Sequence, residues 1–393
     1  MEDKIKVLIT TLFYDNYNYG GILQAYALYH ILENFGYAVE ELNYNRTEKR
    51  TINKNLSRIK RLINITVDPI NYLQRRKLII GQCEMAEKYK ELFPTDPIKM
   101  EFDKFISEEF LVTKLVYPDT IDTLPKYDCY IVGGDQMWNP TWFDKNYFLS
   151  FAKGKKIAYS CSIGKDNLSK KEKKKLKAMI SSISDISVRE KNIYDWLQQE
   201  NVECMWAVDP VFLLTKEEWI EVSNKSKISY EIKTPYLFAY LLGDDTLART
   251  KIKAFAKKNQ LKIVAIPHVC RRYNAADENF ADYSYMNVGP REYIKLILNA
   301  ACVITDSFHG TAFSILFHKS FYSFCRVDGK NDIPMNSRLE SILSEYNLTE
   351  RLVNVNEIDR LDLDAVNYVV SDQYIEQRRK NSIVFMKNAI NKK

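Results

Sequence analysis

The chain has 393 residues, of which 46% are hydrophobic and 27% charged, and its formal net charge is +6. This balance excludes a disordered chain, and the length favours two domains over a single core. The weakly basic charge suits small anionic partners, and we predict no nucleic-acid partner. The seven cysteines show no CxxC spacing, so we expect no disulfide framework, no metal site and a reducing, cytoplasmic location. We find no signal layout at the N-terminus and no apolar run of the ~18 residues that a membrane helix needs.

Strands and helices are predicted to alternate through the first half of the chain. An apolar run at 5–13 indicates a strand, 21–35 has helical spacing that stops at Gly36, and a second strand follows at 38–44. Further strands are expected at 127–132, 156–161, 185–188 and 204–208, with helices at 169–182 and 190–200. A strand–helix–strand opening implies a parallel sheet with helical crossovers.

Residues 45–80 interrupt this pattern with a basic segment in which apolar residues recur at steps of three and four. One interpretation is a solvated helical insertion. The other is an amphipathic surface at 57–80 that lies against anionic lipid headgroups as a peripheral membrane contact.

The second half repeats the alternation after a polar linker at 223–233. Strands are predicted at 236–242, 261–267, 301–305 and 320–325, and helices at 246–259, 290–299, 310–318, 337–346 and 372–390. We therefore predict an α/β protein of two Rossmann-like domains, at 1–222 and 234–370. A C-terminal helix within 371–393 is expected to pack back on the first domain. Ligands of such folds bind at the carboxyl ends of the strands, here in a cleft between the domains.

Two loops at predicted strand ends have the composition of a sugar site. The first, "NYNYGG", follows the first strand and opens a helix, where glycines admit a close ligand and backbone N–H groups are free; its candidates are Asn18, Gly20 and Gly21. The alternative there is a purely structural turn. The second, "VGGDQMWNP", offers a carboxylate, two amides and an indole that can hold a sugar. Its candidates are Asp135, Gln136, Trp138 and Asn139, although Asp135 could instead cap the next helix.

Two further junctions suit an anion. Arg189 and Glu190 lie where a strand passes into a helix; the arginine can bind a carboxylate or phosphate, or the two residues can form a surface ion pair. Near the end of the chain, "TDSFHGT" places His309 between Ser307 and Gly310 at the start of a helix, where it can donate a hydrogen bond or a proton. Basic residues follow at Arg326, Lys330 and Arg338.

Together these stretches resemble the polysaccharide pyruvyl transferase family. The matches, in chain order, are "NYGGILQAYAL", "VGGDQMWNP", "SVRE", the Asp209-Pro210 pair, "VGPREYIKLILNAACVITDSFHGTAFSILFHKSF" and "NSRL". The resemblance implies a GT-B type fold and transfer of pyruvate from phosphoenolpyruvate, as a ketal, to a sugar of a bacterial surface or capsular polysaccharide. It associates Arg189 and His309 with the donor. Some members have arginine where this chain has Ser307, so anion binding shifts to Arg326, Lys330 or Arg338.

The expected roles follow from that chemistry. His309 is the candidate general acid, and Asp135, or as second choice Glu190, is the candidate base. No cofactor is expected beyond phosphoenolpyruvate as co-substrate, and the acceptor is a glycan, in many such systems lipid-linked. A nucleotide-sugar glycosyltransferase of the same fold is the alternative enzyme, and a non-catalytic sugar-binding protein is the third interpretation.

Overall fold

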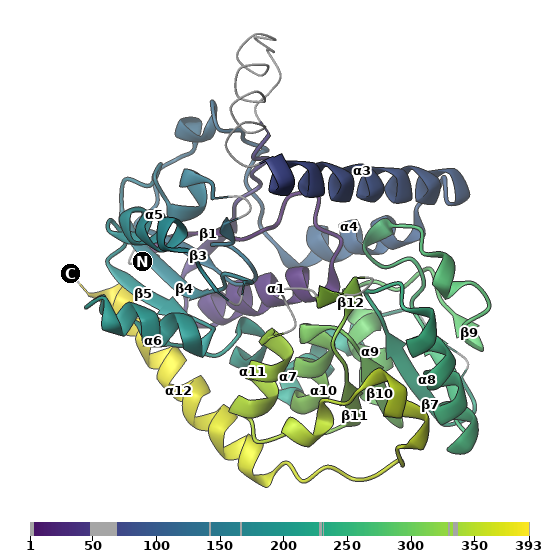
Figure 1. The fold of residues 1–393 in the computed structure, drawn as a ribbon. Coiled ribbons are helices and arrows are strands. Elements are labelled where there is room, and N and C mark those ends of the chain that lie inside the picture. The colour runs from purple at the N-terminus through teal and green to yellow at the C-terminus, as the bar shows by residue number, and fades with distance from the viewer. Residues whose placement is uncertain are drawn as a thin grey trace.

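The computed structural model describes residues 4–47, 69–140, 143–165, 167–227, 230, 232–328, 331–332 and 337–392. Two parallel sheets, each with helices on its faces, form the two halves of the molecule (Figure 1). The predicted basic insertion lies partly outside the described residues. Its last residues begin a long helix, α3, and the side chains through residue 79 are not described.

The first sheet has the strand order β2-β1-β3-β4-β5-β6. Its strands are β1 (Lys6–Thr10), β2 (Ala38–Glu41), β3 (Cys129–Gly133), β4 (Lys155–Cys161), β5 (Asp185–Val188) and β6 (Met205–Trp206). The helices of this half are α1 (Tyr19–Asn34), α3 (Pro69–Leu92), α4 (Pro97–Glu109), α5 (Lys170–Ile180) and α6 (Lys191–Gln199). β3 is buried at every residue because helices cover both faces of the sheet, which explains its continuous apolar sequence.

The second sheet has the order β11-β10-β7-β8-β9. Its strands are β7 (Tyr236–Tyr240), β8 (Lys262–Ala265), β9 (Tyr283–Ser284), β10 (Cys302–Thr305) and β11 (Ser320–Ser323), followed by the short hairpin β12 (Val327–Asp328) and β13 (Asn331–Asp332). The helices are α7 (Lys216–Asn224), α8 (Thr246–Lys258), α9 (Pro290–Asn299), α10 (Phe308–Leu316) and α11 (Ser337–Glu345). These elements confirm the predicted α/β class with two parallel-sheet domains.

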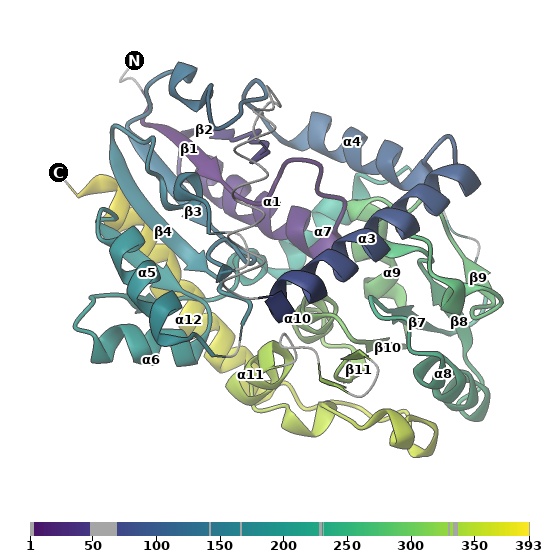
Figure 2. The same ribbon diagram turned by 45° about the horizontal axis from the view of Figure 1, so that its top comes forward.

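Two helices join the halves. α1, which starts right after β1, is buried along most of its length and packs on α9 and α10 of the second half. The final helix, α12 (Val369–Asn391), runs back along the first domain (Figures 1 and 2), where Ser382 accepts a hydrogen bond from the Val208 N–H at 3.2 Å. Lys155 donates to the Ala389 carbonyl near the end of this helix at 2.9 Å. Each of these helices therefore holds one half of the molecule against the other.

Three helices were not predicted from the sequence: most of α3, α4 and α7. α7 falls around the predicted end of the first domain, but it packs against α9 of the second half. Its Trp219 is fully buried and contacts Phe313 of α10 at a centroid distance of 5.1 Å. α7 therefore packs on helices of the second half.

Candidate active site

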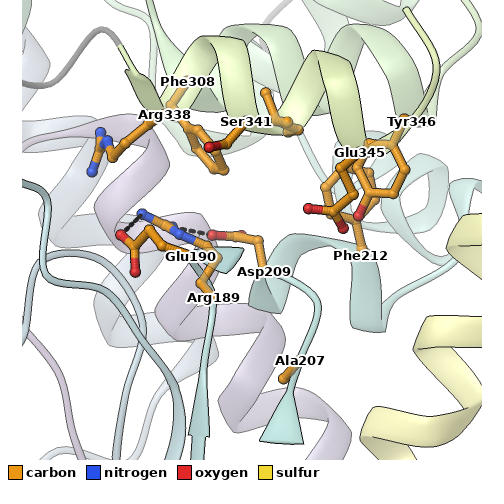
Figure 3. A pocket seen from close by; sticks show the side chains of 11 residues that line it. Arg189, Glu190, Ala207, Asp209, Phe212, Phe308, Arg338, Ser341, Glu345 and Tyr346 are labelled. Carbon is orange, nitrogen blue, oxygen red and sulfur yellow. Dashed lines mark hydrogen bonds and ion pairs between the residues drawn. The ribbon is translucent and has the colours of Figure 1, made fainter. Parts of the chain in front are cut away.

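A small pocket lies where the carboxyl ends of the two sheets meet (Figure 3). From the first domain it is lined by Arg189, Glu190, Ala207, Asp209 and Phe212. From the second it is lined by Phe308, Arg338, Ser341, Ile342, Glu345 and Tyr346. Both domains therefore contribute side chains to its lining.

Arg189 is the centre of the polar wall. It follows the last residue of β5, and its carbonyl accepts a hydrogen bond from the Trp206 indole at 2.8 Å, which fixes the backbone there. The guanidinium is only 6% exposed. One Nη donates to the Asp209 carboxylate, and the other donates to Asp135 Oδ1 and to Ser162 Oγ, both at 2.9 Å. An arginine so enclosed is held rigidly in one orientation.

Arg338 reaches the same place from the other domain. It stands in the first turn of α11, and its Nη1 donates to Asp135 Oδ1 at 2.7 Å. One carboxylate oxygen therefore bridges two guanidiniums that belong to different domains. Burial alone would raise the pKa of the Asp135 carboxyl, but Arg338 and Arg189 hold that pKa well below its usual value.

The ring of Phe308 lies beside both arginines. The Arg189 guanidinium carbon is 4.3 Å and the Arg338 carbon 5.3 Å from the ring centroid. The face of an aromatic ring attracts cations and excludes water, so it stabilises two like charges at close quarters. Figure 3 shows this ring next to Arg338, above Arg189.

His309 lies in the first turn of α10, which begins at Phe308, two residues earlier than predicted. Its side chain is almost completely buried, and Nε2 is 3.7 Å from Asp209 Oδ2. Among the described residues, Nε2 has no hydrogen-bond partner. The charged group that this nitrogen faces is therefore the Asp209 carboxylate.

Asp209 is one of the site residues that the sequence interpretation did not assign, although the Asp209-Pro210 pair was among the matching stretches. It stands between Arg189 and His309 and is 2% exposed as a side chain. Against the effect of burial, Arg189 and His309 lower the pKa of Asp209 to about 2. Its position after the predicted 204–208 strand was the available signal, because carboxyl ends of neighbouring parallel strands meet at one edge.

Several predicted contacts prove to be internal to the protein. The Glu190 carboxylate accepts from Ser162 and from the N–H groups of Ile163 and Gly164, so it anchors a loop. Ser307 caps α10 by accepting the Gly310 N–H at 3.3 Å. A side chain on Gly310 would place its Cβ 2.5 Å from Thr305 Oγ1, so this glycine serves close packing of α10 on β10.

The residues of the first predicted sugar loop also make contacts within the protein. Asn18 caps α1 by accepting the Gly21 N–H at 3.0 Å. A Cβ on Gly20 would lie 2.0 Å from His309 Nδ1, and one on Gly21 would lie 2.6 Å from the Asn16 amide. The close neighbour that requires glycine at position 20 is therefore the catalytic histidine candidate itself.

The second predicted sugar loop has one side chain in the site. Trp138 is fully buried, stacks on Phe148 at 5.5 Å and donates from its indole to the Tyr147 carbonyl, so it cannot receive a sugar ring. Asn139 is largely buried and donates to Gln136 Oε1 at 3.0 Å. Asp135 remains the member of this loop that meets the arginines.

The predicted basic residues Arg326, Lys330 and Arg338 do not all lie in the site. Arg338 is in the site, whereas Arg326 lines a separate cavity with Gly243, Arg249 and Asp306 at the edge of the second sheet. Lys330 lies outside the described residues. Within the described ranges, no group of His, Cys, Asp and Glu side chains could hold a metal ion, and no helix is long and apolar enough to cross a bilayer.

Two Rossmann-like domains around an interdomain site define a GT-B fold. A solved structure from Listeria monocytogenes, provisionally identified as a UDP-N-acetylglucosamine 2-epimerase, has a TM-score of 0.53 at 10% identity and covers 98% of this chain and 96% of that chain. UDP-N-acetylglucosamine 2-epimerase from Rickettsia bellii has a TM-score of 0.47 at 12% identity, with 98% and 99% covered. At these identities the likeness shows the fold alone.

The family comes from the sequence. Residues 18–324 match the polysaccharide pyruvyl transferase family, and the chain therefore belongs to it. This confirms the resemblance and identifies the protein as a polysaccharide pyruvyltransferase. A search of curated protein sequences finds no match to this chain.

Proposed function

We propose that the enzyme takes its pyruvyl group from phosphoenolpyruvate and joins it as a ketal to two hydroxyls of one sugar. The observation that carries this proposal is the convergence of Arg189 and Arg338 on one oxygen of Asp135, next to Asp209, which contacts both Arg189 and His309. Phosphoenolpyruvate has a carboxylate and a phosphate, about three negative charges at neutral pH. Two buried guanidiniums are the groups best suited to bind such a molecule.

The reaction balances without a cofactor. A proton adds to C3 of the donor, and C2 becomes electrophilic enough for attack by the first sugar hydroxyl. The C2–O bond to phosphate then breaks, and the second hydroxyl closes the ketal. Of the two hydroxyl protons, one replaces the proton spent on C3 and the other leaves with phosphate. Neither a metal nor an organic cofactor is needed for any of these steps.

The residues divide this work as follows. Arg189 and Arg338 bind the donor anion, and His309 protonates C3, with Asp209 providing a negative charge that matches a protonated imidazole ring. Asp135 is the proposed base for the hydroxyl, in preference to Glu190, whose oxygens are occupied by a loop. Ser341 lines the same face of α11 as Arg338 and suits a hydroxyl of the acceptor, whereas Glu345 on that face pairs with Arg378.

The test is mass spectrometry of candidate acceptor glycans incubated with the protein and phosphoenolpyruvate. A gain of one pyruvate less one water is the expected product, whereas a gain of a sugar residue from UDP- or GDP-sugars would establish the glycosyltransferase alternative. His309→Gln is expected to lower turnover ~10²–10⁴-fold while donor binding changes much less. Near-normal turnover in that variant would remove His309 from the role of acid.

A further inference from the structure

We propose that Asp135 is a displaceable counterion, which gives up its place between Arg189 and Arg338 to the donor anion and is thereby released to deprotonate the acceptor hydroxyl. Donor binding and base activation are then one event. This inference rests on the proposed function, since it takes the donor to be a small multiply charged anion such as phosphoenolpyruvate.

The charges around the two arginines require such a displacement. Arg189 and Arg338 are surrounded by three carboxylates, those of Asp135, Asp209 and Glu190. An anion that joined this group without displacing a carboxylate would add its negative charges to a buried site where three carboxylates already balance the two arginines and a protonated His309. If one carboxylate moves away, the two guanidiniums keep only two carboxylate partners. The donor anion can then accept the hydrogen bonds that the departing carboxylate gave up.

Of the three carboxylates, Asp135 is the one placed to leave. Asp209 is held by the Val211 N–H at 3.0 Å as the cap of the turn Pro210–Leu213, and Glu190 is held by two backbone N–H groups. The hydrogen bonds of Asp135 run to the two guanidiniums that the donor would occupy. Its side chain is also the most exposed of the three, at 18% against 9% for Glu190 and 2% for Asp209.

The backbone around Asp135 fits a movable role. Gly134 has φ +84° and Gln136 has φ +54°, so Asp135 stands between two residues in the left-handed region. That conformation is unfavourable for a glutamine, and small changes of φ and ψ at these positions would swing the carboxylate away. Trp138, buried three residues further on, fixes the end of the loop and limits the movement to this short stretch.

Release also solves a chemical difficulty. While both arginines contact Asp135, they hold its pKa far too low for an effective base. Once the donor neutralises the arginines, this effect on the carboxylate weakens. The first hydroxyl proton then moves to Asp135 as the oxygen bonds to C2, and it passes to the departing phosphate; the second hydroxyl proton restores His309.

The test compares wild type with Asp135→Asn, which keeps the size of the side chain and removes its charge. Asp277→Asn is the matched control, since Asp277 is a similarly buried carboxylate that pairs with Arg249 outside the site. Calorimetry should show that Asp135→Asn binds phosphoenolpyruvate about tenfold more tightly than wild type, because the internal competitor has lost its charge. Turnover of Asp135→Asn should nevertheless fall ~10²–10⁴-fold, and the control should match wild type in both measurements.

The possible outcomes are distinct. Weaker or unchanged donor binding by Asp135→Asn, with normal binding by wild type, overturns the displacement and leaves the proposed function standing. Tighter binding with unchanged turnover overturns the role of Asp135 as base. Wild type that binds no phosphoenolpyruvate removes the proposed function and this inference with it. Asp135→Ser, too short to reach both arginines, gives the same comparison if Asp135→Asn does not fold.

Discussion

The variant Arg338→Ala tests whether Arg338 binds the donor or only joins the two domains. The Arg338 side chain is 9% exposed, and its Nη1 is 2.7 Å from Asp135 Oδ1, a charge-assisted hydrogen bond between the domains. Such a bond contributes about 1.5–3 kcal/mol. In Arg338→Ala, Asp135 keeps Arg189 as a partner, so the free energy of unfolding should fall by about 1.5–2 kcal/mol, in the lower part of that range.

In Arg338→Ala, the loss of binding free energy for the donor should be at least as large as the loss in the free energy of unfolding. Phosphoenolpyruvate would lose one of two buried guanidiniums, and a loss of about 1.5–3 kcal/mol corresponds to a Kd roughly 10- to 150-fold higher. Arg338→Lys keeps the charge but not the planar pair of donors, so its Kd should lie between those of wild type and Arg338→Ala.

The assays are urea unfolding and calorimetry with phosphoenolpyruvate. Arg351→Ala serves as control, because Arg351 is equally buried and pairs with Asp364 at 2.7 Å, away from the pocket. This control should lose stability and keep donor affinity. If Arg338→Ala behaves like Arg351→Ala in both assays, Arg338 only joins the domains and the donor site has been placed wrongly.

Three other perturbations follow from particular contacts. Gly20→Ala would place a methyl group 2.0 Å from His309 Nδ1; displacement of the ring should lower turnover by about 10²-fold, whereas Gly81→Ala, with nothing within 4 Å, should leave turnover unchanged. Burial raises the pKa of Glu41 well above 4.5 despite hydrogen bonds from Thr11, so wild type should lose stability as pH rises from 5 to 8; equal loss in Glu41→Gln by urea unfolding would contradict this. Finally, the basic segment 57–80 should cause co-sedimentation with anionic but not neutral vesicles, lost at about 0.5 M salt, where the Debye length is below about 5 Å; equal binding to both vesicle types would refute the electrostatic contact.

Much of the fold could be predicted because its signals are local. Most of the parallel strands are buried on both faces and appear as short apolar runs, so their positions were correct within a few residues, whereas the two-residue edge strand β9 was not predicted. The helices with weaker patterns were missed. α7 was not predicted, and its fully buried Trp219 is recognisable as core only when α9 and α10 are in place.

For the site, sequence patterns were enough to indicate the family and the kind of residues that stand at the ends of the strands: Arg189, Asp135 and His309 follow β5, β3 and β10. Which of these side chains meet became clear from the folded structure. Arg338, 203 residues from Asp135 in the chain, reaches the same oxygen as Arg189, while Trp138 turns into the core and Arg326 lines another cavity. The physical reason is that the periodicity of apolar residues reports burial along one element, whereas a charge pair across two domains depends on how their sheet edges are brought together.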